Sequence, residues 1–250
     1  MIFRCVLATV ATIAFAGTGA VADTPNIYQV TLAEPNQKTQ EVSTEQLRRL
    51  LKEGSAVVLD TRSRAEFEAG HIPGARNLDT PAPAQIAAVE QALDGDKTKA
   101  LVLYCNGPFC QASRRLADQL VGAGFTNVRR YQLGIPVWRA LGGPIAMGLD
   151  GIARIINADR TAVFIDGRSP EDFAKGSLPN AHSAPLADVV SGKLKKLPLP
   201  EDDFNRRIVL LGYDAAHARQ FAELLSTRPW HNVAYVAVTF EALKSALLTK

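Results

Sequence analysis

An internal duplication is the feature that most constrains the fold of this 250-residue chain. The segment AVFIDGRSPEDFAKGSLPNAHSAPL at 162–186 repeats the pattern of VVLDTRSRAEFEAGHIPGARNL at 57–78. The matching residues are Asp60 and Asp166, Arg62 and Arg168, Phe67 and Phe173, Gly70 and Gly176, Pro73 and Pro179, and Ala75 and Ala181. One repeat at a spacing of about one hundred residues predicts two similar domains rather than the short stacked units of a solenoid.

The duplication continues beyond these two segments. RIVLLGYDAAHARQFAELL at 207–225 repeats ALVLYCNGPFCQASRRLADQL at 100–120, and NVAYVAVTFEAL at 232–243 repeats NVRRYQLGIPVWRAL at 127–141. The order of segments is therefore the same in both halves, which indicates that a whole domain was duplicated.

The duplication sets the expected domain organisation. We place one domain at 41–145 and a second at 150–248, with GGPIAMGLDG at 142–151 as the boundary. Residues 23–40 form an N-terminal extension, and the residues before them form a targeting segment.

Strands and helices alternate within the first domain. Short apolar runs predict buried strands, and amphipathic segments predict helices. The expected strands are 56–62, 100–105 and 127–132, and the expected helices are 44–54, 83–93 and 113–124. This alternation predicts the α/β class, with each domain a parallel sheet flanked by helices.

Two helices carry more specific signals. Ser43 and Gln46 fit a capping box at the start of the first helix, and Gly54 suits its C-terminal end. In the helix at 113–124, we expect Leu116, Leu120 and Val121 to share the buried face.

The first 22 residues have the order of a secretory signal peptide. Arg4 precedes an apolar run at 5–16, and small residues end in Ala20-Val21-Ala22. The alternative is a membrane anchor, but the apolar run is shorter than the roughly 20 residues that a spanning helix needs. We expect cleavage after Ala22 and a periplasmic or secreted protein.

Cleavage would leave Cys105 and Cys110 as the cysteines of the mature chain. Thiols tend to pair in an oxidising compartment, so the two form either a bridge or a guarded reactive pair. The four histidines are scattered, with no C-x-x-C or H-x-x-x-H spacing, so we expect neither a metal nor another cofactor. A net charge of +3 is too small to indicate a nucleic-acid partner.

The loop after the strand LVLYC is the candidate site, with the nucleophile at Cys105. Unpaired N–H groups in the first turn of the following helix favour an anion there, so they stabilise a thiolate. The alternative is a buried structural cysteine. The expected loop residues are Asn106, Gly107, Pro108, Phe109, Gln111, Ala112 and Ser113, and Arg114 is a possible anion-binding residue.

The string DTRSRAEFEAGHIPGARNL, the cysteine that ends LVLYC and the following GIPVW resemble the rhodanese (sulfurtransferase) family. The resemblance covers roughly residues 40–145 and again 150–248. It implies that Cys105 takes a sulfane sulfur from a donor such as thiosulfate, and that the persulfide passes this sulfur to a thiophilic acceptor. The expected partners are thus a small sulfur compound and a thiol acceptor, and the resemblance names no protein partner.

The loop departs from the family pattern, because Cys110 stands where the family often has a cation. It also excludes a cysteine phosphatase, which needs Arg after five residues where this chain has Gln111. Three roles remain open for Cys110: attack on the persulfide, a permanent loop clip, or none. Two rival functions also remain, a binding module with a fixed Cys105–Cys110 disulfide and a thiol–disulfide redox protein.

The second domain is expected to lack transfer chemistry. The position that matches Cys105 falls near Gly212 and Tyr213, and no thiol follows. His217 is expected to be a solvated helix residue. In the first domain, we expect Asp60 and Arg62 to be structural, and His71 to be a hydrogen-bonded turn residue.

Overall fold

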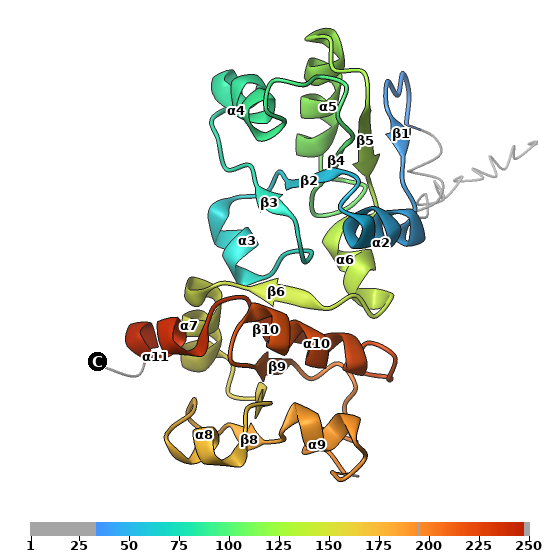
Figure 1. The fold of residues 1–250 in the computed structure, drawn as a ribbon. Coiled ribbons are helices and arrows are strands. Elements are labelled where there is room, and N and C mark those ends of the chain that lie inside the picture. Colours follow the sequence, from blue (N-terminus) through green and yellow to red (C-terminus); the bar gives the residue numbers. More distant parts are fainter. Residues whose placement is uncertain (1–33, 195, 248–250) are drawn as a thin grey trace, which may run out of the picture.

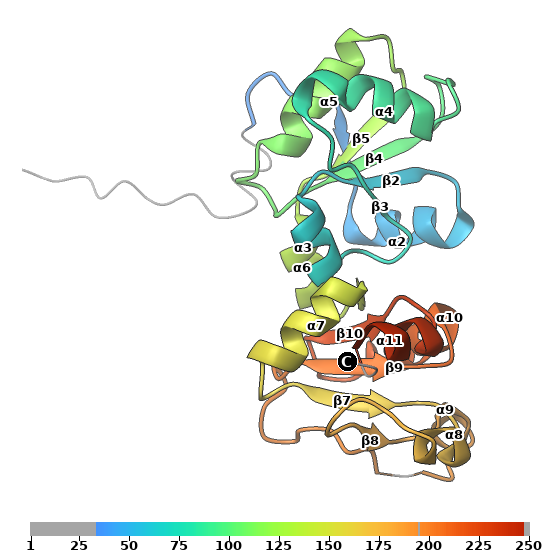
Figure 2. The same ribbon diagram turned by 90° about the vertical axis from the view of Figure 1, so that its left-hand side faces the viewer.

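The computed structural model describes residues 34–194 and 196–247. Figure 1 shows two α/β domains, one above the other, and Figure 2 gives the perpendicular view. Each domain holds a five-stranded sheet whose paired strands are all parallel. The expected fold class is therefore confirmed. The signal peptide expected at 1–22 lies outside the described residues.

The first domain contains these elements in chain order: β1 Gln40–Glu41, α2 Thr44–Glu53, β2 Val57–Asp60, α3 Arg64–Ala69, β3 Arg76–Asn77, the 3-10 turn η1 Ala82–Ala84, α4 Gln85–Ala92, β4 Leu101–Tyr104, α5 Ala112–Gly122, β5 Val128–Tyr131 and α6 Gly134–Ala140. The strand order across its sheet is β1-β5-β4-β2-β3, which places β4 in the centre.

The second domain repeats this order: β6 Ile145–Met147, α7 Leu149–Ala158, β7 Val163–Asp166, α8 Pro170–Ala174, β8 His182–Ser183, α9 Leu186–Val190, β9 Ile208–Leu211, α10 Ala215–Leu225, β10 Val233–Val236 and α11 Phe240–Leu247. Its sheet order, β6-β10-β9-β7-β8, matches the first strand for strand. The duplication in the sequence is thus a duplication of the fold.

The start of α2 follows its sequence signal. Ser43 Oγ accepts the Gln46 N–H at 3.2 Å, and the Gln46 side chain accepts the Ser43 N–H at 2.7 Å. Gly54 ends the helix with φ +62°, a left-handed conformation that glycine adopts without a steric penalty. The predicted capping box is confirmed.

The helix α5 departs from its sequence prediction at one residue. Leu116 and Leu120 are fully buried against the sheet, but Val121 is 37% exposed. Successive helical residues are about 100° apart, so Val121 lies beside the stripe that Leu116 and Leu120 form. Ala117 completes that buried stripe instead.

The segment expected to separate the domains carries structure of its own. Residues 142–151 contain β6, which pairs with β10 of the second sheet, and the start of α7. An antiparallel bridge also joins His71 to Ala146, with both N–H···O distances at 3.0 Å. The segment is therefore part of the second sheet and is also hydrogen-bonded to the first domain.

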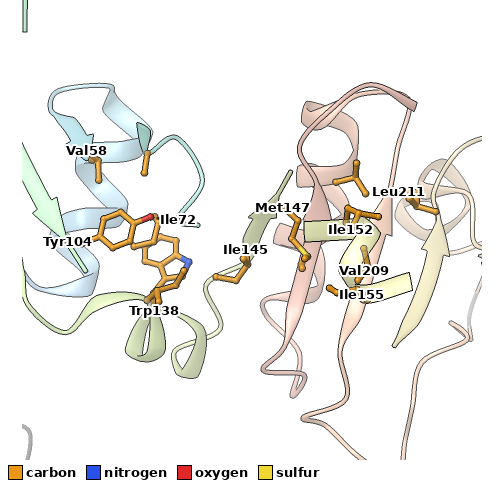
Figure 3. Close-up of a cluster of buried hydrophobic side chains, with 14 of the residues drawn as sticks. Val58, Ile72, Tyr104, Trp138, Ile145, Met147, Ile152, Ile155, Val209 and Leu211 are labelled. Atoms are coloured by element: carbon orange, nitrogen blue, oxygen red, sulfur yellow. Dashed lines mark hydrogen bonds between the residues drawn. The ribbon is translucent and has the colours of Figure 1, made fainter. Parts of the chain in front are cut away.

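Apolar packing continues from one domain into the other. Helices α2 and α6 cover one face of the first sheet, and α7 and α11 cover the facing side of the second. Ile145 and Met147 of β6 lie between these layers (Figure 3). The cluster includes Tyr104 and Trp138 on one side and Ile152 on the other. Because burial of this apolar surface favours the joined state, the two domains form one packed unit.

The remaining faces have separate cores. Helices α4 and α5 pack on the outer face of the first sheet, and α9 and α10 on that of the second. Within the described ranges, no helix is both long enough and apolar enough to cross a membrane.

Candidate active site

Cys105 is the first residue after β4, the central strand of the first sheet. Its side chain is 3% exposed, and a disulfide joins it to Cys110, with the Cα atoms 6.2 Å apart. The turn between them is closed by the Cys110 N–H, which donates to the Gly107 carbonyl at 3.0 Å. Gly107 has φ +110°, so glycine is needed for this path.

The start of α6 packs against this loop. The Ile135 N–H donates to the Cys105 carbonyl oxygen at 3.2 Å. Gly134 has φ +65°, and a Cβ atom there would overlap the Cys105 oxygen and the Gly107 nitrogen. The close approach of α6 therefore fixes the backbone of the candidate nucleophile.

The helix α5 begins at Ala112, two residues after Cys110. Its N-cap residue, Gln111, makes no side-chain capping hydrogen bond. Among the described residues, the first-turn N–H groups of α5 thus have no N-cap side chain as a partner, and such groups favour an anion. Ser113 is buried in that turn, whereas Phe109 is 75% exposed at the tip of the loop and Cys110 is partly exposed.

Asn106 ties the loop to α3. Its Nδ2 donates to Glu66 Oε1 at 2.6 Å. This hydrogen bond, together with the bonds from Ser63, lowers the pKa of Glu66 although partial burial opposes the shift. Neither the Asn106–Glu66 contact nor the role of Gly134 was foreseen from the sequence. The available signals were the recurrence of an acid at Glu66 and Asp172 and the glycine in GIPVW.

Arg114, a possible anion-binding residue by its position, is paired with a carboxylate of the chain instead. Its Nε lies 2.8 Å from Glu34 Oε1, and its Nη2 donates to the Pro35 carbonyl at 2.6 Å. Glu34 also accepts two hydrogen bonds from the buried Arg130, both at 2.9 Å. The guanidinium of Arg114 therefore binds the N-terminal extension in this structure.

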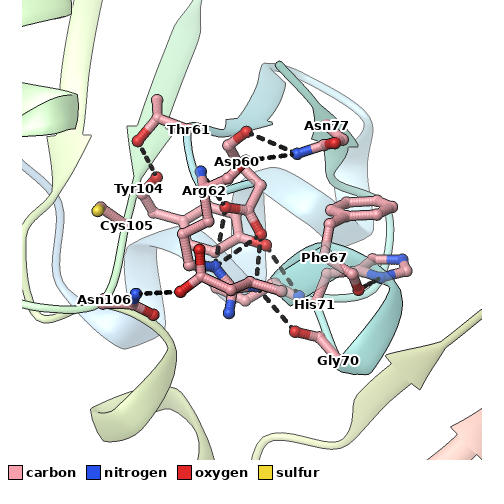
Figure 4. Close-up of polar contacts among 12 residues, drawn as sticks. Asp60, Thr61, Arg62, Phe67, Gly70, His71, Asn77, Tyr104, Cys105 and Asn106 are labelled. Atoms are coloured by element: carbon pink, nitrogen blue, oxygen red, sulfur yellow. Dashed lines mark hydrogen bonds and ion pairs between the residues drawn. The ribbon is translucent and has the colours of Figure 1, made fainter. Parts of the chain in front are cut away.

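Asp60 and Arg62 form a buried pair beside the loop (Figure 4). Arg62 Nε lies 2.9 Å from Asp60 Oδ1, and Nη2 lies 2.6 Å from Oδ2 and 2.8 Å from the Gly70 carbonyl. Burial alone would lower the pKa of Arg62, but the hydrogen bonds and charge of Asp60 raise it. Asp166 and Arg168 repeat this geometry in the second domain, which supports a structural role for both pairs.

His71 lies at the end of the same network. Its ring stacks on Phe67 with centroids 3.6 Å apart, and Nδ1 lies 2.9 Å from the Phe67 carbonyl oxygen. Burial lowers the pKa of His71. The side chain is fixed in the turn, in agreement with the expected role.

The second domain fills the corresponding site. Gly212 stands directly after β9, and a Cβ there would lie 2.6 Å from the Ala218 nitrogen and 2.8 Å from His217 Nδ1. The Asp214 side chain caps α10 by accepting the His217 N–H at 2.9 Å. The start of α10 is thus capped by a side chain, whereas that of α5 has no side-chain cap. The contacts around Gly212 leave no room for a side chain there.

Tyr213 closes the second site further. Its hydroxyl accepts the Ser169 N–H at 2.9 Å and donates to Asp172 Oδ2 at 3.0 Å. His217 packs edge-to-face on this ring and is partly exposed, so it is less solvated than expected. Across the described ranges, no group of three or more His, Cys, Asp or Glu side chains is arranged to hold a metal ion.

The protein thus has two parallel-sheet α/β domains in tandem. In the first, a cysteine follows the central strand, and we call residues 105–111 the thiol loop. In the second, the corresponding position is filled. The rhodanese-like domain family matches the chain twice, at 43–141 and 150–246. The chain therefore belongs to the rhodanese-like domain family.

Two curated relatives and one solved structure are examples of what the chain is similar to. The chain is 36% identical over 99 residues to the thiosulfate sulfurtransferase GlpE of Pseudomonas putida, a match that covers 40% of this chain and 84% of that protein. It is 32% identical over 107 residues to the HTH-type transcriptional regulator Rv0324 of Mycobacterium tuberculosis. That match covers 43% of this chain and 45% of the regulator. The solved thiosulfate sulfurtransferase from Pseudomonas aeruginosa is 16% identical with a TM-score of 0.39, and the match covers 84% of this chain and 43% of that one.

Proposed function

We propose that the protein is a sulfurtransferase that uses Cys105 of the first domain as its nucleophile. The observation that carries this proposal is the position of Cys105 between the central strand β4 and the uncapped first turn of α5. Helix amides in that position stabilise a thiolate and then a persulfide anion. Relatives that include a thiosulfate sulfurtransferase support the same chemistry.

The first half-reaction requires the reduced loop. The Cys105 thiolate attacks the outer sulfur of thiosulfate, the bond between the two sulfur atoms breaks, and its electron pair leaves with sulfite. A bond between Cys105 Sγ and the transferred sulfur forms in exchange. An organic persulfide can serve as the donor in the same way, with a thiolate as the leaving group.

The second half-reaction has two possible acceptors. An external thiophile, such as a thiolate, attacks the outer sulfur and releases the Cys105 thiolate. Alternatively, the Cys110 thiolate attacks Cys105 Sγ, hydrosulfide leaves, and the two cysteines form the disulfide of this structure. In the second case the sulfane sulfur is reduced to sulfide, and an external dithiol must then reduce the disulfide.

One observation favours a second candidate function. Cys105 and Cys110 are bonded, and a permanent bond would make the protein a binding module without transfer activity. The roles differ in whether the reduced protein takes up sulfur. Intact-protein mass spectrometry after reduction, removal of the reductant and addition of thiosulfate should show the mass of one added sulfur atom. Neither added sulfur nor released sulfide from thiosulfate, polysulfide or a persulfide would support the binding module.

We also propose that the protein works outside the cytoplasm. The order of charged, apolar and small residues at 1–22 supports export, and a cysteine pair that can form a disulfide suits an oxidising compartment. N-terminal sequencing of the protein from a periplasmic extract tests this proposal, since cleavage after Ala22 would leave Asp23 as the first residue.

A further inference from the structure

A cavity of about 260 Å³ lies between the two domains. Its wall includes Arg62 and Glu66 of the first domain, Arg139 of α6, and Arg207 and Asn232 of the second domain. A water molecule takes up roughly 30 Å³ in the liquid, so the cavity has room for a small ion and some water. Cavities between domains are common ligand sites.

Arg139 lacks a counter-ion in the described part of the chain. Its Nη2 donates to Asn232 Oδ1 at 2.7 Å, a neutral partner across the domain boundary. Burial and the positive charge of Arg207 both lower the pKa of Arg139. A partly buried guanidinium that faces a second cation destabilises the folded protein unless an anion joins it.

The other two arginines at the cavity are already paired with carboxylates. Arg207 Nε lies 3.1 Å from Asp159 Oδ2, and Arg62 is held by the buried Asp60. Glu66 is the acidic group among the described lining residues, and its carboxylate accepts hydrogen bonds from the side chains of the loop and of the α3 cap. Among the described residues, Arg139 is therefore the lining arginine without an ion-pair partner, and Glu66 is the lining carboxylate without one.

We propose that this cavity binds a small oxyanion between Arg139 and Arg207. Guanidinium groups present pairs of N–H donors with the spacing of oxyanion oxygens, and charge-assisted bonds of this type are strong. The anion would contact one arginine from each domain and so would stabilise their packing. Ile135, on the same helix as Arg139, donates to the Cys105 carbonyl, so α6 connects the oxyanion site to the thiol loop.

The test is calorimetric titration of the full-length protein with sodium sulfate at low ionic strength, where screening by salt is weak. We expect saturable binding of one anion per chain and a rise in melting temperature. Replacing Arg139 by Met should weaken binding at least about tenfold. If that variant does not fold, Arg139→Gln keeps a donor for Asn232 and removes the charge.

Arg206 provides the matched control. It neighbours Arg207, is paired with Asp202 at 3.4 Å and does not line the cavity. Arg206→Ala should bind sulfate as the wild type does. The proposal is overturned if no saturable binding occurs, or if the Arg139 variants bind as tightly as the Arg206 variant.

Two sources of oxyanion share this chemistry. Tighter binding of thiosulfate and sulfite than of phosphate would assign the site to the sulfur reaction, whereas equal or tighter binding of phosphate would assign it to a free cellular anion. Both results support the site itself. The Cys105→Ser variant should keep full binding because Cys105 does not line the cavity, so this test is independent of sulfur transfer.

Discussion

Gly134 packs directly against the carbonyl group of Cys105, at the point where β5 leads into α6. It has φ +65°, and a methyl group on its Cα would overlap both the Cys105 oxygen and the Gly107 nitrogen. The position thus requires glycine for its backbone conformation and for space. The path of the thiol loop depends on this contact between segments about 30 residues apart.

Replacing Gly134 by Ala should therefore be strongly destabilising. The backbone strain and the overlap with two main-chain atoms together predict a loss of about 2–4 kcal/mol in the free energy of unfolding. We also expect slower uptake of sulfur from thiosulfate, because the loop must move to admit the methyl group. Urea denaturation measures the first effect and stopped-flow persulfide formation the second.

Gly54 separates the two causes. It has φ +62°, but no atom of the described residues lies within 4 Å of the position that a Cβ would take, so Gly54→Ala introduces strain without overlap. We expect a loss of about 1 kcal/mol and unchanged sulfur uptake. Equal losses of stability in the two variants would show that packing against Cys105 does not matter.

Much of the fold could be predicted from the sequence, because its signals are local or periodic. The capping box at Ser43 and Gln46 depends on residues three apart, and the duplicated D-x-R motif recurs with the same spacing. The place of Cys105 at the end of a central strand followed from the apolar run before it and the amphipathic segment after it.

The missed features depend on contacts between distant segments. Arg114 is turned toward Glu34, 80 positions earlier, and Asn106 bonds to Glu66, 40 positions earlier. The strand at 145–147 is only three residues long, and its pairing with β10 gives no periodic signal in so short a run. Such contacts become visible only when the topology has brought the segments together.

The pH dependence of stability should carry a contribution from Glu41. Burial raises the pKa of Glu41 from 4.5 to about 7, although the charge of Arg130 opposes this. The folded state then binds the proton more tightly than the unfolded chain does. This contribution is present below pH 4.5 and is lost as pH rises toward 7. Glu41→Gln should remove that slope and raise stability near pH 8 by about 1–3 kcal/mol.

Urea denaturation at several pH values between 4 and 8 measures this slope. Glu45→Gln is a suitable control because Glu45 is exposed in the first turn of α2, which follows β1, the strand that contains Glu41. The wild type and the control should lose stability in parallel, while the Glu41 variant stays flatter. A wild type whose stability rises across the same range would contradict the assignment.

The two cysteines should have separable roles in sulfur transfer. Cys105→Ser should abolish persulfide formation, because a serine hydroxyl is barely ionised near neutral pH and cannot hold the sulfur. Cys110→Ser should keep the first half-reaction, lengthen the lifetime of the persulfide, and stop the sulfide release that occurs without an external acceptor. Mass spectrometry follows the persulfide, and a sulfide electrode follows the release.

Each alternative role of Cys110 gives a different result in that variant. A structural clip would show as a lower melting temperature of Cys110→Ser with an unchanged persulfide lifetime. Unchanged stability, lifetime and sulfide release would make Cys110 a bystander. Persulfide found in Cys105→Ser would refute Cys105 as the nucleophile and would assign the sulfur to Cys110, because the second domain has no cysteine.

The disulfide should open by attack on one particular sulfur. Cys105 is 3% exposed and lies against the start of α6, whereas Cys110 is partly exposed. An external thiolate therefore reaches Cys110 Sγ, the bond to Cys105 Sγ breaks, and the electron pair leaves on Cys105. The amides of α5 stabilise this leaving thiolate. Reduction would then release the nucleophile in its reactive form.

Glutathione tests this direction because it carries a single thiol. Unlike a dithiol reagent, it has no second thiol of its own that would displace the mixed disulfide it forms with the protein. After brief treatment of the oxidised protein and alkylation of the free thiol, peptide mapping should find glutathione on Cys110 and the alkyl group on Cys105. In urea, where the difference in exposure is lost, both cysteines should carry glutathione. Glutathione mainly on Cys105 in the folded protein would mean that the buried sulfur is the accessible one, and the proposed order of attack would be wrong.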